Sequence, residues 1–98
     1  MKNLTDYINE AVTPSFGKGM AINDFKWKKN TNYILRYNPH EKRYEIFAEG
    51  GQRGFGRYPM YVFNSTDATI GVEIVHYVQD KFGKGTSNIS YDGTTYGF

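Results

Sequence analysis

The segment from residue 50 to 59, GGQRGFGRYP, is expected to form an exposed glycine-rich loop, and it carries side chains that could contact a partner. In an extended backbone alternate side chains share one side, so Arg53, Phe55 and Arg57 would present a ring between two guanidinium groups. Such a surface can stack on a planar group and neutralise negative charge at once. Together with Tyr58, these residues are our first candidates for partner binding. An alternative stays open, in which the glycines form tight turns while Phe55 and Tyr58 fill the core.

Basic residues are concentrated in the middle of the chain. Eight basic and three acidic residues lie between positions 26 and 57, which gives this part a charge of +5 although the whole chain carries only +2. Lys26 and Lys28 open this region, and we add them to the candidate partner-binding residues. A basic face attracts an acidic protein surface or a nucleic-acid backbone. The alternative is that the strands simply expose these charges to water, as we expect for Glu45 and Glu49.

Motifs for catalysis and for metal binding are incomplete. The chain has no cysteine, which excludes disulfides, thiolate metal sites and cysteine nucleophiles. The histidines, His40 and His76, fall in a predicted turn and on a predicted helix, and the Glu73/His76 pair lacks the second pair that carboxylate metal centres use. A phosphate-binding loop would need lysine and serine or threonine where Arg57 and Tyr58 stand. We therefore expect no catalytic residue, no metal and no cofactor.

The four residues Arg53-Gly54-Phe55-Gly56 resemble the opening of the RNP1 signature of RNA-recognition motifs. The resemblance implies aromatic side chains that stack on bases from the surface of a sheet. The match ends at Arg57, where the signature has an aromatic residue, and Pro59 follows inside what should be a paired strand. We therefore do not assign the chain to this family, but RNA or single-stranded DNA binding remains an alternative function.

Alternation of apolar and polar residues predicts the strands. Residues 33–37 and 44–48 alternate on either side of a turn at 38–42 that contains proline, which is typical of a hairpin. Phe25 and Trp27 alternate with Lys26 and Lys28, so a further strand is expected there, and another at 60–63. Asp92-Gly93 predicts a tight turn in a small terminal hairpin.

Helical periodicity predicts an N-terminal helix within residues 3–12 and a longer helix over residues 70–82. We therefore expect one small α+β domain over residues 1–98. It would contain an antiparallel sheet of four to five strands, with the N-terminal helix and the longer C-terminal helix packed on it.

These patterns favour a cytoplasmic, non-enzymatic binding protein, an inhibitor or adaptor for a protein partner with an acidic surface. A small enzyme with an unrecognised site is a further alternative. No apolar run approaches the ~20 residues of a membrane span, so no membrane partner is expected. In its short opening helix, its small size and its lack of cysteine, the chain resembles phage-encoded accessory proteins. This resemblance would imply an inhibitor of a host factor. The sequence does not define the oligomeric state.

Replacing both Arg53 and Arg57 by alanine should weaken partner binding and leave the fold intact. Exposed substitutions change stability by less than about 0.5 kcal/mol, whereas a hot-spot arginine contributes about 2 kcal/mol or more to binding. Titrations at several salt concentrations also distinguish the partners. Single-stranded nucleic acid held by about three or four phosphates gives a log–log slope of roughly −2 to −3, and a protein partner much less. Unchanged affinity for every partner would mean that the segment is structural.

Overall fold

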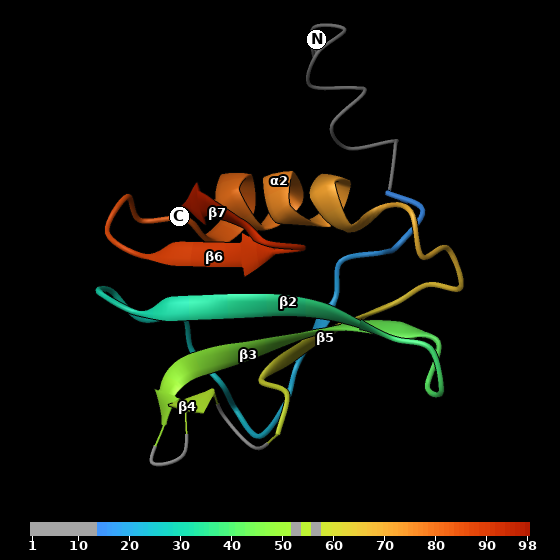
Figure 1. The fold of residues 1–98 in the computed structure, drawn as a ribbon, viewed down its shortest axis with the longest axis horizontal. Coiled ribbons are helices and arrows are strands. Elements are labelled where there is room, and N and C mark those ends of the chain that lie inside the picture. The colour runs from blue at the N-terminus through green and yellow to red at the C-terminus, as the bar shows by residue number, and fades with distance from the viewer. Residues whose placement is uncertain (1–13, 52–53, 56–57) are drawn as a thin grey trace, which may run out of the picture.

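The computed structural model describes residues 14–51, 54–55 and 58–98, and for residues 50, 51, 54 and 55 it describes the backbone alone. Figure 1 shows the arrangement of the elements. The strands are β1 (Met20–Ala21), β2 (Asn32–Asn38), β3 (Arg43–Gly51), β4 (Gly54–Phe55), β5 (Tyr61–Asn64), β6 (Asn88–Tyr91) and β7 (Thr94–Gly97), and the helix is α2 (Gly71–Phe82).

The strands form one mixed sheet in the order β1-β5-β3-β2-β6-β7, and β4 pairs with β3 outside this order. β2 and β6 are parallel, whereas the other paired strands are antiparallel. Our prediction of an antiparallel sheet of four to five strands under two helices is therefore wrong. The described ranges contain a single helix, and the helix predicted within residues 3–12 lies outside them.

The parallel pair has a physical cause in the connection between β5 and β6. β5 and β2 each pair antiparallel with β3, so β5 runs in the same direction as β2 and β6. Parallel strands need a long crossover connection, and α2 supplies it. Strand periodicity alone does not reveal this, because alternation looks the same in parallel and antiparallel pairs.

The two predicted hairpins are confirmed. In the first, β2 pairs with β3 so that Leu35 faces Ile46, and Asn38 Oδ1 accepts hydrogen bonds from the backbone N–H groups of His40 and Glu41, both at 3.0 Å. The second joins β6 to β7 through Asp92 and Gly93, whose φ angles of 51° and 81° are those of a type I′ turn.

The main core lies between the sheet and α2. The helix begins at Gly71, close to the predicted start, and places Ile74, Val75 and Val78 against the sheet, where all three are fully buried. Aromatic and aliphatic residues of the strands face them. The buried strand residues of this cluster are Tyr33, Leu35, Tyr44, Ile46, Tyr61, Phe63 and Ile89.

Residues 25–28 do not form the strand that their alternation predicts. They follow an irregular path, yet the Phe25 and Trp27 side chains are half-buried against the core while Lys26 and Lys28 are exposed. The Trp27 ring stacks on Phe82 at 5.2 Å with an interplanar angle of 21°. The prediction that the aromatic and lysine side chains face opposite sides is therefore correct, although the prediction of a strand is wrong.

The Tyr44 hydroxyl joins β3 to the segment before α2. It donates a hydrogen bond to the Asp67 carbonyl oxygen at 2.7 Å and accepts one from the Ile70 N–H at 3.2 Å. The side chain is fully buried, and this burial raises the pKa of Tyr44 to about 12. The fold therefore favours the neutral phenol.

Stability is expected to fall as the pH rises from about 10 towards 12, because the folded-state pKa of Tyr44 lies above the ordinary tyrosine value of 10.0. Below that range this contribution is fully present. Tyr44→Phe should remove its part of the pH dependence and destabilise the fold by about 1–3 kcal/mol, because it leaves the Ile70 N–H and Asp67 carbonyl without their partner. Urea unfolding between about pH 8 and about pH 11 measures both effects. Tyr37→Phe is the control, because its ring contacts Tyr44 but its hydroxyl makes only a long bond of 3.4 Å. Equal unfolding curves for the Tyr44→Phe variant and the wild type would contradict this role.

Candidate functional site

The structure describes three of the six predicted partner-binding side chains. Lys26 and Lys28 are exposed, and Tyr58 is 69% exposed. Phe55 lies in β4, where its backbone pairs with Glu49. The side chain of Phe55, and Arg53 and Arg57 entirely, lie outside the described residues.

Hydrogen bonds bring residues 22–28, which we call the lysine segment, next to the segment that follows residue 57. The Ile22 N–H donates to the Met60 carbonyl oxygen at 3.0 Å, and the Met60 N–H donates to the Ile46 carbonyl oxygen at 2.7 Å. The rings of Trp27 and Tyr61 lie 5.2 Å apart. In Figure 1 these two segments meet at the bottom of the molecule, at the same end as β4. We call Lys26, Lys28 and Tyr58, together with β4, the lysine end.

Three hydrogen bonds fix the backbone that carries the lysines. The Lys28 N–H donates to the Tyr33 hydroxyl at 2.8 Å, and the Ser87 hydroxyl donates to the Lys28 carbonyl oxygen at 2.8 Å. Ser87 Oγ also accepts from the Thr31 N–H at 3.1 Å. The irregular segment is therefore anchored by two buried residues, Tyr33 of β2 and Ser87 just before β6, while its lysines face solvent.

The segment 50–59 is only partly a loop. β3 continues through Gly51, which pairs with Gly54, and the register shifts between Glu49 and Gly51. Glycine permits such irregularities because it lacks a Cβ. The prediction of an exposed loop is therefore wrong for residues 50, 51, 54 and 55, which are strand residues.

Part of the positive charge in the middle of the chain is neutralised within the sheet. Arg43 contacts Glu45 Oε2 through Nε and Nη2, both at 2.8 Å, and Asn38 Nδ2 donates to Glu45 Oε1 at 3.2 Å. Only 7% of Glu45 is exposed. Sequence reasoning expected an exposed glutamate here, and the signal it missed was the neighbouring arginine two residues away on the same strand face.

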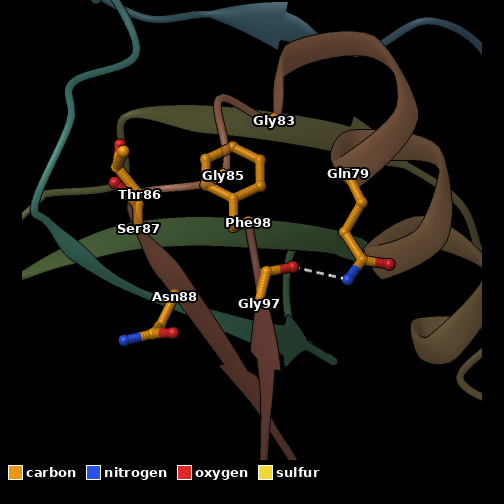
Figure 2. Close-up of a pocket in the computed structure, with 8 residues that line it drawn as sticks. All are labelled: Gln79, Gly83, Gly85, Thr86, Ser87, Asn88, Gly97 and Phe98. Carbon is orange, nitrogen blue, oxygen red and sulfur yellow. Dashed lines mark hydrogen bonds between the residues drawn. The ribbon is translucent and has the colours of Figure 1, made fainter.

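A shallow pocket of about 470 Å³ lies where α2, the following loop and the end of β7 meet. Figure 2 shows Gln79 reaching across it, with Nε2 donating to the Gly97 carbonyl oxygen at 2.6 Å. The N–H groups of Lys84, Gly85 and Ser87 point at the Phe98 carbonyl oxygen, at 3.1–3.3 Å. Because Phe98 occupies these donors, they do not offer an anion-binding site. The sequence analysis did not identify this pocket.

The two histidines are not brought into a catalytic arrangement. His40 lies in the β2–β3 turn, and His76 on α2 places Nδ1 2.9 Å from Gln79 Oε1. Because the Gln79 amide nitrogen donates to Gly97, its oxygen faces His76, whose Nδ1 must carry the proton. His76 therefore orients Gln79.

Among the residues that the structure describes, no group of three or more histidine, aspartate and glutamate side chains could hold a metal ion. Within the same ranges, α2 is too short and too polar to cross a lipid bilayer. No family model, curated protein or solved structure matches this chain.

Tyr33→Phe should loosen the lysine segment, because the Lys28 N–H loses its acceptor. We expect faster amide exchange at Lys28 and a loss of about 1–3 kcal/mol in the free energy of unfolding. Hydrogen exchange followed by NMR measures the first, and denaturant unfolding the second. Tyr96→Phe, which changes a strand tyrosine that is only half-buried, should change neither. Unchanged Lys28 exchange in Tyr33→Phe would show that other contacts hold this segment.

Proposed function

We propose that the protein is a non-enzymatic binding protein, an inhibitor or adaptor, that contacts an acidic protein surface through the lysine end. The observation that carries this proposal is the hydrogen bond between Ile22 and Met60, which holds the lysine segment beside the segment that carries Tyr58. Exposed cations and an exposed aromatic ring thus lie on one end of the sheet. Arg53 and Arg57 remain partner-binding residues predicted from the sequence, and they lie outside the described residues.

The anchoring of this surface supports a binding role. The Lys28 backbone is held by Tyr33 and Ser87, so the lysines need little further backbone ordering when a partner binds. Preordered contacts reduce the entropy cost of association. Tyr58 supplies an aromatic side chain of the type that is enriched at the centres of protein interfaces.

The charge arrangement favours a protein partner over nucleic acid. Single-stranded nucleic acid is held by a positive groove that follows several phosphates. Here Arg43 is paired with Glu45, and Glu49, next to β4 in the sheet, is an exposed acid, so the described residues do not form a continuous positive groove. A mixed surface of this kind fits a protein with acidic residues around an apolar or aromatic contact.

The test compares two probes, a peptide rich in glutamate and tyrosine and a single-stranded oligonucleotide of the same net charge. Lys26→Glu/Lys28→Glu should weaken peptide binding by about tenfold or more, which corresponds to about 1.4 kcal/mol. Fluorescence anisotropy at several salt concentrations gives both affinities.

Lys18→Glu/Lys81→Glu is the matched control, because it makes the same charge change at exposed positions outside the lysine end. Peptide binding by this control should stay within about twofold of wild type if long-range charge effects are screened. An equal loss in both double variants would contradict the proposed site. Tighter binding of the oligonucleotide, with a steep salt slope that decreases in Lys26→Glu/Lys28→Glu, would establish the nucleic-acid alternative instead.

A further inference from the structure

β7 is an edge strand, and its outward backbone groups can be assigned from its pairing with β6. Ser87 and Phe98 exchange both backbone hydrogen bonds, at 2.8 and 3.3 Å. The register continues unbroken along the hairpin to Tyr91 and Thr94. Because bonded and non-bonded pairs alternate in an antiparallel ladder, the backbone N–H and C=O groups of Thr95 and Gly97 point away from β6.

These outward N–H and C=O groups make almost no hydrogen bonds. Gln79 Nε2 donates to the Gly97 carbonyl oxygen, which keeps a second lone pair. In the part of the chain that the structure describes, no hydrogen bond engages the outward N–H and C=O of Thr95 or the N–H of Gly97. Thr95 and Gly97 are exposed, and β7 (TTYG) contains neither charge nor proline, the usual protections of an edge.

We propose that β7 pairs with β7 of a second copy of this chain, in an antiparallel arrangement about a two-fold axis at Tyr96. In this register Thr95 of each copy faces Gly97 of the other, and each such pair exchanges two backbone hydrogen bonds. Centring the axis on Thr95 would instead pair Gly97 with Gly93, a turn residue with φ of 81°. Only the Tyr96 register matches every outward donor and acceptor within the strand.

Opposite charges at the two ends of β7 favour a second copy of this chain as the partner of the β7 edge. Asp92 precedes β7 in the turn, and Lys84 lies beside the other end, where its N–H donates to the Phe98 carbonyl oxygen at 3.3 Å. Antiparallel pairing about Tyr96 brings Asp92 of one copy towards Lys84 of the other, and the symmetry repeats this contact. Both residues are exposed. This interface uses none of the residues of the lysine end, so the two proposals can fail separately.

The first test is the mass in solution, measured by sedimentation equilibrium up to about 1 mM protein, where even a weak dimer is populated. The wild type should approach twice the monomer mass. Thr95→Pro removes the outward N–H but no bond to β6, so it should stay folded by circular dichroism and raise the dimer dissociation constant at least about tenfold. Thr95→Ala keeps the backbone groups and should dimerise like the wild type. A wild type that stays monomeric, or a Thr95→Pro variant that dimerises normally, overturns the proposal.

The second test uses the charge contact and does not depend on tolerance of proline. Lys84→Glu should weaken the dimer by about fivefold over the two symmetric contacts, and adding Asp92→Asn should recover part of that loss. In the wild type, amide exchange at Thr95 and Gly97 should slow as protein concentration rises, while Tyr96, bonded to β6, should not change. Exchange at Thr95 and Gly97 that is independent of concentration in a dimeric sample would place the interface elsewhere and overturn the proposal.

Discussion

The packing of Trp27 is the interaction on which the rest of the structure depends. Its ring lies 5.1–5.2 Å from those of Tyr33, Tyr61, Phe82 and Phe98, so one side chain joins β2, β5, α2 and the residue after β7. A chain with 39% hydrophobic residues has few aliphatic side chains to bury, and aromatic rings of roughly 150–250 Å² each make up the deficit. Because Trp27 stands between Lys26 and Lys28, the residue that closes the core also determines where these two cations emerge.

A core built from tyrosine also needs partners for its hydroxyl groups, and the loops supply them. Tyr33 accepts from Lys28, Tyr44 bonds to Asp67 and Ile70, and Tyr61 donates to the Lys18 carbonyl oxygen at 3.0 Å. In the described part of the chain, no buried side-chain nitrogen or oxygen lacks a hydrogen-bond partner. Each tyrosine therefore holds an irregular segment against the sheet. These hydrogen bonds explain why the loops of this protein have a defined conformation.

Local sequence patterns predicted the structures that depend on neighbouring residues. They did not predict the structures that depend on contacts between residues far apart in the sequence. The β2–β3 hairpin follows from alternation around Asn38, and the terminal turn from Asp92-Gly93, because both depend on neighbouring residues. The parallel pairing of β2 with β6 depends on the crossover and has no local signal. Glu45 was expected in solvent, but pairing with Arg43 buries it. At the candidate site, the exposure of Lys26 and Lys28 followed from the period of two, whereas their anchoring by Ser87, 59 residues beyond Lys28, could not be predicted from sequence.

The parallel pair also has a consequence for how the chain folds during synthesis. β2 and β3 can form their hairpin as soon as residue 51 has left the ribosome, but the other edge of β2 is completed only by residues 88–90. Until then the central strand of the final sheet is an open edge carrying Tyr33 and Leu35, both of which are buried in the finished fold. Such long-range pairings slow folding and leave partly folded chains prone to aggregation. While it is being made, this chain therefore passes through a stage in which the backbone of β2 is paired along one edge only.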